Sequence, residues 1–144
     1  MTQFLTQPFV EKLRQRYGVL VVDDDDAILE TLDFSLQQSG FAVWLAPDGP
    51  AALELYRRHA DAIDVLLIDV RMPGQDGPAI LSAIQELSPS VACCFMSGDM
   101  GDYTVEHLHW MGAAAVFDKP FQMALLTGAL QALAMHHRRA GNKT

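Results

Sequence analysis

The sequence contains no long hydrophobic run. Its wholly apolar stretches are far shorter than the ~20 consecutive apolar residues that a membrane-spanning helix needs. The first residues, MTQFLTQPFVEKLRQRYG, also lack the continuous apolar stretch of a secretory signal. We therefore expect a cytoplasmic protein that does not enter a membrane.

Positive charge is scarce as well. The 144 residues include 10 lysines and arginines against 18 aspartates and glutamates, which gives a formal net charge of −8. Nucleic acids and anionic membranes bind basic surfaces, so we expect neither as the main partner. The basic cluster HHRR at 136–139 is too short for a nucleic-acid groove, and we interpret it as favourable charge at the end of the last helix.

Cysteine is limited to an adjacent pair, Cys93 and Cys94, within the apolar run VACCFM. Neighbouring residues in a strand point to opposite faces, which suits a disulfide badly. We interpret both as small buried hydrophobic residues in a reducing compartment.

Short apolar runs recur at even intervals, separated by stretches with the apolar spacing of helices. This alternation predicts parallel strand–helix–strand units, and the unbroken apolar runs are typical of strands covered on both faces. We therefore predict an α/β domain of five strands and five helices. The five predicted strands are VLVV (19–22), FAVWLA (41–46), VLLI (65–68), VACCFM (91–96) and AAAVF (113–117).

The rest of the chain divides around this domain. We expect a leader at 1–17, one domain at 18–137 and a basic tail at 138–144. In the leader, Phe9, Leu13 and Tyr17 have helical spacing, and both a docked amphipathic helix and a loose arm fit this pattern. Helical spacing in the fourth predicted helix places Val105 inward and Trp110 toward solvent.

Acidic residues stand where the predicted strands end. Asp23 and Asp24 follow the first strand and Asp69 follows the third, while Ser97 and Lys119 end the fourth and fifth. In an open parallel sheet the carboxyl ends of the strands form the ligand-binding edge. Each residue alone has an ordinary explanation as a helix cap, loop residue or surface residue, but all five fall at the same edge. Carboxylates gathered there need a cation, and oxygen ligands favour Mg²⁺, with Mn²⁺ as an alternative.

The aspartate run VLVVDDDDAI has a second part. Asp25 and Asp26 lie where the first helix begins, and carboxylates at that position accept free backbone N–H groups and face the positive end of the helix dipole. We therefore assign two aspartates to the metal pocket and two to the helix start.

Five sequence elements in order resemble the receiver domain of two-component response regulators, such as the chemotaxis regulator. The resemblance runs from about Val19 to His136. It implies a flavodoxin-like, doubly wound sheet with strand order 2-1-3-4-5, and we expect a stand-alone single-domain regulator. The elements are VVDDD, IDVRMPGQDG, FMSGD, the pair Gly112-Ala113, and DKPF.

The resemblance also implies roles for residues of the site. Asp69 would be the phosphoacceptor, and with Asp24 it would bind Mg²⁺ directly. The backbone carbonyl of Arg71 would complete the protein ligands, while Asp23 would act through a metal-bound water.

Further roles follow from the same resemblance. Lys119 would pair with phosphoryl oxygens, Ser97 would hydrogen-bond one of them, and the bond before Pro120 would be cis. The protein would be a signalling phosphoacceptor rather than an enzyme, with slow self-dephosphorylation. Its partners would be a sensor histidine kinase or phosphotransfer protein and a downstream protein, and the oligomeric state, including a homodimer, stays open.

Some positions depart from the family pattern. Val116 stands where most relatives have an aromatic residue, with Phe117 beside it, so we expect a reduced or rerouted change of the face formed by the fourth helix, fifth strand and fifth helix. Trp110 is a candidate partner contact on that face. Arg71 and Asp99 lie two residues after Asp69 and Ser97, and an ion pair between them could slow water attack.

Two other functions remain alternatives at this point. A degenerate receiver could serve only as a protein-docking module, an interpretation that Val116 keeps open but the complete acidic set opposes. A phosphatase of the haloacid dehalogenase type uses similar groups. However, that family begins with a D-x-D nucleophile strand, whereas here the acidic pair comes first and DVR has no second aspartate.

Overall fold

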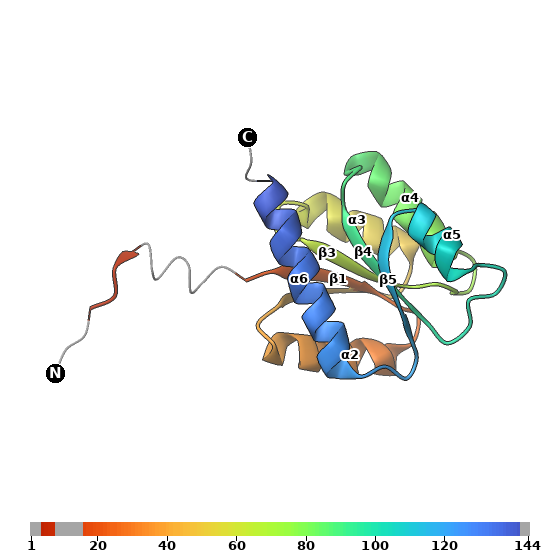
Figure 1. Cartoon of the computed structure of the whole chain (residues 1–144), viewed down its shortest axis with the longest axis horizontal. Helices are drawn as coiled ribbons and strands as arrows, with labels where there is room; N and C mark the ends of the chain where they lie inside the picture. The colour runs from red at the N-terminus through yellow and green to blue at the C-terminus, as the bar shows by residue number, and fades with distance from the viewer. Residues whose placement is uncertain (1–3, 8–15, 142–144) are drawn as a thin grey trace.

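The protein folds around a five-stranded parallel sheet with strand order β2-β1-β3-β4-β5 (Figure 1). The structure, a computed structural model, describes residues 4–7 and 16–141. The order reverses at β1, because β1 pairs with β2 on one side and with β3 on the other. Both the predicted fold class and the strand order are confirmed. The strands are β1 (Gly18–Val22), β2 (Ala42–Ala46), β3 (Val65–Asp69), β4 (Ala92–Ser97) and β5 (Ala113–Asp118).

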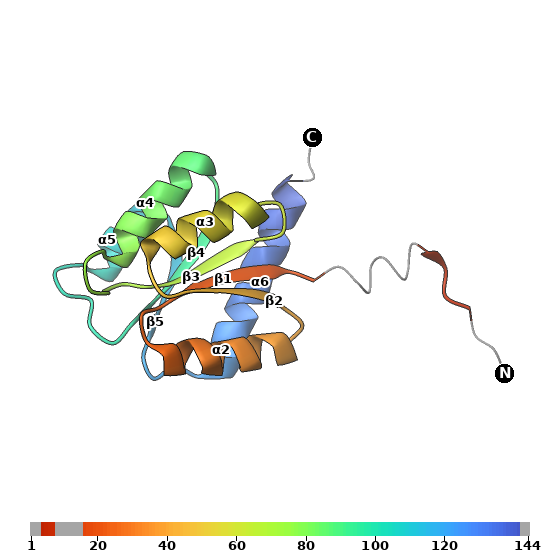
Figure 2. The ribbon, with the colours of Figure 1, turned by 180° about the vertical axis from the view of Figure 1, so that it is seen from behind.

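Helices cover both faces of the sheet. Helices α2 and α6 lie together on one face, and α3, α4 and α5 lie on the other, as the front and back views show (Figures 1 and 2). This doubly wound arrangement explains why the predicted strands lack polar alternation. The helices are α2 (Asp26–Gln38), α3 (Gly49–His59), α4 (Gly77–Leu87), α5 (Val105–Trp110) and α6 (Met123–Gly141).

Each strand contributes to two separate hydrophobic clusters. In β1, Val19 and Val21 face the α2/α6 layer, whereas Leu20 and Val22 face the other layer. Cys93 and Cys94 follow the same alternation: both thiols are free and fully buried, in opposite clusters. Burial without a stabilising charge raises the pKa of Cys94 to about 12, which suits an inert, buried thiol.

Polar side chains fix where the helices begin. Asp25 caps α2, accepting from the backbone nitrogens of Ala27 and Ile28, and Asp26 is the first residue of that helix. The predicted role of these two aspartates at the helix start is therefore confirmed. At the other end of α2, Gly40 adopts a positive φ of 93°, the conformation that favours glycine after a helix.

A partly buried ion pair lies at the amino edge of the sheet. Asp64, only 4% exposed, precedes β3 and accepts from the backbone nitrogen of Gly18 at 2.9 Å. The guanidinium of Arg138 reaches the same carboxylate at 2.6 Å, donates to the carbonyl of Arg16 and lies 4.5 Å from the ring centre of Tyr17. The pair thereby joins the end of α6 to the residues that lead into β1.

Some terminal expectations need correction. The segment predicted as a tail from 138 onward continues α6 as far as Gly141, because Arg138 is held by Asp64. Phe9 and Leu13 of the predicted leader lie outside the described residues, as does 142–144. Among the helices described, none is long and apolar enough to cross a membrane.

One inward-facing residue was also predicted wrongly. Val105 is half exposed, because it is the first residue of the six-residue helix α5. Leu108 of the same helix is fully buried, and Trp110 points to solvent as predicted, with 85% of its surface exposed.

Candidate functional site

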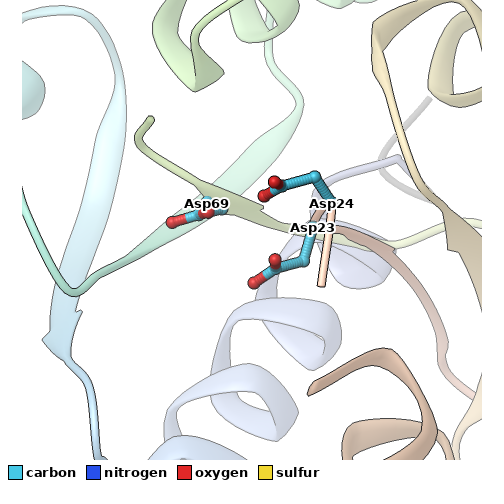
Figure 3. A group of neighbouring side chains, drawn as sticks. All are labelled: Asp23, Asp24 and Asp69. Atoms are coloured by element: carbon cyan, nitrogen blue, oxygen red, sulfur yellow. The ribbon is translucent and has the colours of Figure 1, made fainter. Parts of the chain in front are cut away.

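Three carboxylates meet at the carboxyl edge of the sheet. Asp69 is the last residue of β3, and Asp23 and Asp24 follow β1 directly. Because Val22 pairs in register with Ile68, the two strands end side by side. One oxygen atom from each carboxylate lies within 4.8 Å of the others (Figure 3). Asp23 and Asp69 are buried, whereas Asp24 is exposed.

Lys119 lies against the two buried carboxylates. Its Nζ donates to Asp23 Oδ2 at 2.7 Å and lies 3.4 Å from Asp69 Oδ1. Burial alone would lower the pKa of the lysine, but the adjoining carboxylates outweigh burial and raise it, so the ammonium form is retained. Lys119 directly follows β5, and its backbone nitrogen donates to the carbonyl of Ser97 at 2.8 Å.

The free carboxylate of Asp69 is electrostatically unfavourable. Burial removes its hydration and Asp23 adds a like charge; together they raise its pKa from 3.8 to about 6, although Lys119 opposes the rise. Asp23 is better satisfied, since its second oxygen accepts from the backbone nitrogen of Asp25 at 2.9 Å. Asp69 is therefore the member of the group with most to gain from additional positive charge.

A buried hydroxyl stands beside these charges. Ser97 ends β4 at the same edge, and its neighbour Met96 pairs in register with Asp69. The Oγ of Ser97 is buried and makes no hydrogen bond with any described residue. A buried hydroxyl without a partner is unfavourable, so this oxygen is available to a group that binds at the site.

The donor set fits a hard divalent cation. Three carboxylates surround one ammonium, which leaves negative charge uncompensated within a small volume. All-oxygen donors with an exposed member, Asp24, suit Mg²⁺, which retains several waters when it binds to proteins. Arg71 lies two residues beyond Asp69, and the use of its carbonyl as a ligand stays a prediction.

The outer residues of the site lie as the sequence indicated. Arg71 Nη1 lies 3.2 Å from Asp99 Oδ2, so the predicted ion pair is present, with both side chains more than half exposed. The peptide bond between Lys119 and Pro120 is cis, as the resemblance implied. Val116 and Phe117 are partly buried and pack against opposite clusters.

Two contacts near the site were not predicted. Tyr103 donates to Asp76 across two loops at 2.8 Å, and Gly77 packs so tightly on β3 that an added Cβ would overlap the carbonyl oxygen of Asp69. The motif MPGQDG contains both Asp76 and Gly77, and its glycine could have signalled a close backbone approach. Nothing local in the sequence indicated that Tyr103 is the partner of Asp76.

The five-stranded parallel sheet and its acidic carboxyl edge are features of a receiver domain, and comparison with known families agrees. The family model described as the response regulator receiver domain matches residues 19–131, and the chain belongs to this family. It is 36% identical over 123 residues to the transcriptional regulatory protein CseB of Streptomyces coelicolor, a match covering 85% of this chain and 51% of that protein. The chain thus spans about half the length of this curated relative.

Other matches cover very different shares of the similar protein. Sensor kinase CckA of Brucella abortus is 32% identical over 120 residues, covering 81% of this chain but 13% of that protein. Among solved structures, a receiver domain from Clostridium thermocellum matches with a TM-score of 0.78 and 26% identity, covering 86% of this chain and 98% of that one. The CheX–CheY–BeF3–Mg²⁺ complex from Borrelia burgdorferi matches with a TM-score of 0.75 and 26% identity, covering 84% and 96%.

Proposed function

We propose that the protein is a phosphoacceptor whose Asp69 carboxylate accepts a phosphoryl group from a phosphohistidine. The observation that carries this proposal is the placement of Asp69 beside Lys119, with the unpartnered Ser97 hydroxyl ending the adjoining strand. A carboxylate approached by a phosphate needs nearby cations to offset repulsion, and phosphoryl transfer depends mainly on positioning and charge stabilisation.

Transfer of the phosphoryl group to Asp69 involves no change of oxidation state and needs no oxidant or reductant. A carboxylate oxygen of Asp69 attacks phosphorus as the phosphorus–nitrogen bond of the donor breaks, and the imidazole leaves with the electron pair of that bond. Lys119, already 3.4 Å from Asp69, neutralises charge on the equatorial phosphoryl oxygens. Ser97 gains its missing partner by donating to one of these oxygens.

The acidic residues have a separate task. Asp24 and Asp69, with the carbonyl of Arg71, would hold Mg²⁺ or Mn²⁺ directly, and Asp23 would act through a water ligand. The ion would supply positive charge that offsets repulsion between the carboxylates and the incoming phosphoryl group. Asp23 meanwhile orients Lys119 through its 2.7 Å contact.

Water reverses the modification by attacking phosphorus and releasing inorganic phosphate and the free carboxylate. Arg71 and Asp99 bridge the loops that follow the strands of Asp69 and Ser97. We therefore assign this pair a part in setting the rate of dephosphorylation. Its effect is limited by exposure of both side chains.

The response to phosphorylation is proposed to reach the surface formed by α5, β5 and α6. Engagement of Ser97 would shift the loop after β4, and a local charge change of this kind biases a two-state element. Val116 and Phe117 lie in β5, and the exposed Trp110 lies in α5, where it is available to a protein partner. With valine at 116, the change would be smaller or take another route.

Protein partners follow from this chemistry. A sensor histidine kinase or phosphotransfer protein would supply the phosphoryl group, and a downstream protein would read the altered surface. The similarity to a segment of a sensor kinase and to a chain of a CheX–CheY complex supports partners of this class.

The decisive experiment uses acetyl phosphate as the donor and intact mass as the readout. We expect a phosphoryl adduct that requires Mg²⁺, that is lost in Asp69→Asn and that falls strongly in Lys119→Gln. Asp26→Asn is the matched control, because Asp26 lies in the same aspartate run but begins α2 outside the carboxylate group. An adduct that persists in Asp69→Asn would identify another nucleophile, and no adduct in the wild type would favour a docking module.

A further inference from the structure

Two loops flank the carboxylate group, and side chains join them. The β3–α4 loop (70–76) follows Asp69, and the β4–α5 loop (98–104) follows Ser97. The exposed Arg71–Asp99 ion pair is one connection. An exposed pair fixes a loop only weakly, so the position of these residues needs a further support.

Tyr103 supplies a second connection between the two loops, and this one is less exposed to solvent than the Arg71–Asp99 pair. Its hydroxyl donates to Asp76 Oδ2 at 2.8 Å in a partly buried hydrogen bond. The other oxygen of Asp76 accepts from the backbone nitrogen of Ala79 at 3.0 Å and caps α4. Tyr103 directly precedes Thr104, the cap of α5. One carboxylate thus joins the start of α4 to the start of α5.

Asp76, which accepts the hydrogen bond from Tyr103, is held in a fixed position relative to Asp69. Gly77, next to Asp76, donates its backbone N–H to the carbonyl of Val70 at 2.7 Å. Its backbone packs so closely on Asp69 that a Cβ there would overlap the carbonyl oxygen of Asp69. Asp76 therefore cannot move far without moving Asp69, and the hydroxyl of Tyr103 is tied to the same frame.

The β4–α5 loop, which contains Tyr103, also packs against the side chain of Arg71. Asp99 Oδ1 accepts from the backbone nitrogen of Gly101 at 2.8 Å. Gly101 has a φ of +60°, and a Cβ on it would lie 2.8 Å from Cδ of Arg71, so the arginine lies directly against this backbone. Tyr103 continues the turn by donating its backbone N–H to the carbonyl of Met100 at 3.1 Å.

Packing alone does not close the space between the loops. A cavity of about 450 Å³ lies there, with Arg71, Asp76 and Tyr103 in its lining. The Tyr103 ring packs beside His107, with ring centres 5.4 Å apart, a contact that phenylalanine would keep. The hydroxyl is therefore the part of Tyr103 that spans the loops.

We infer that Tyr103 is a positioning residue for the phosphorylation site: its hydrogen bond to Asp76 holds the β4–α5 loop so that Asp99 stays paired with Arg71, which slows water attack on phosphorylated Asp69. The inference rests on the proposed function of Asp69. It adds to that function a residue outside the set proposed to bind the phosphoryl group or the metal ion.

The test compares lifetimes of the phosphoryl group in folded protein after acetyl phosphate is removed. Tyr103→Phe removes one oxygen, and we expect the lifetime to fall about fivefold, the factor for one net hydrogen bond. Asp76→Ser should act alike, because serine still caps α4 but is too short to reach the tyrosine. A purely structural role would lower the melting temperature and leave the lifetime of the folded protein unchanged.

A double-mutant cycle tests the route through Arg71. Arg71→Ala should shorten the lifetime, and adding Tyr103→Phe to it should produce no further change. A normal lifetime in either single variant, or effects that add in the double variant, would overturn the inference. Failure of the wild type to form the adduct would instead reject the proposed function.

A second readout does not depend on phosphorylation. In unphosphorylated Tyr103→Phe, the Gly101 amide, which donates to Asp99, should exchange its hydrogen about fivefold faster than in wild type. Wild-type exchange at Gly101 in the variant would show that the hydroxyl does not hold the loop, whatever the chemistry at Asp69.

Discussion

Replacing Asp69 by asparagine should change how the stability of the metal-free protein depends on pH. In the folded protein the pKa of this carboxyl rises from 3.8 to about 6, because it is buried and lies beside Asp23. The folded state therefore holds a proton that the unfolded state has released, and the free energy of unfolding falls as pH rises through this window. The full effect of ionisation is about 3 kcal/mol. Asparagine does not titrate, so the Asp69→Asn variant does not lose this free energy of unfolding as pH rises.

A convenient experimental pH range covers only part of this ionisation effect. At pH 5 the unfolded carboxyl is already ionised while the folded one is mostly protonated, so about half of the effect has developed. Between pH 5 and pH 7.5 the wild type should lose about 1.5 kcal/mol relative to Asp69→Asn. Asparagine also keeps an oxygen that can accept from Lys119, so the comparison isolates the charge.

Urea unfolding in the presence of EDTA measures this difference at both pH values. The two proteins should diverge as pH rises, with the variant the more stable at pH 7.5. Adding Mg²⁺ at pH 7.5 should stabilise the wild type more than the variant, since a cation that binds only the folded state raises its stability. Parallel pH profiles in EDTA would refute the electrostatic account, because they would mean that neither burial nor the charge of Asp23 disfavours the ionised carboxylate of Asp69.

Two further predictions concern the frame around the site. Arg138→Met should lower the free energy of unfolding by about 2 kcal/mol, because it leaves the buried carboxylate of Asp64 without its cation, whereas the exposed Arg139→Met should change it little. Denaturant melts of both variants check this, and equal effects would contradict it. Gly77→Ala should destabilise by more than ~2 kcal/mol through overlap with β3, while Gly128→Ala, with open space in α6, should stabilise by about 0.5–1 kcal/mol. Thermal melts that show the same sign for both glycines would refute the contact.

Much of the fold followed from local pattern. Unbroken apolar runs such as VLVV identify strands buried on both faces, and Gly40 and Gly112 mark helix ends through the backbone conformations they permit. The group formed by Asp23, Asp24 and Asp69 could also be predicted, because parallel strands present their carboxyl ends at one edge. These inferences need only the order of residues along each element.

Other features lay beyond local pattern. Val105 has the spacing of a core residue, yet the short length of α5 leaves it half exposed. The predicted positive charge at the end of the last helix is confirmed by Arg138 and Arg139 in the last turn of α6, but nothing local indicated that Arg138 binds Asp64, 74 positions away in the chain. The same holds for Tyr103 and Asp76, whose hydrogen bond joins two loops that are unrelated in sequence.

The amino-acid sequence by itself determined the alternation of strands and helices, the edge at which the acidic residues gather and the family to which the domain belongs. Periodicity, caps and strand ends are local properties, and local forces produce them. Only the tertiary structure decided which atoms meet: Lys119 with Asp23 across 96 positions, and Tyr103 with Asp76. It also left the Ser97 hydroxyl without a hydrogen-bond partner among the residues that the structure describes. Such contacts depend on how packed layers place distant loops, and packing is a property of the whole chain rather than of any segment.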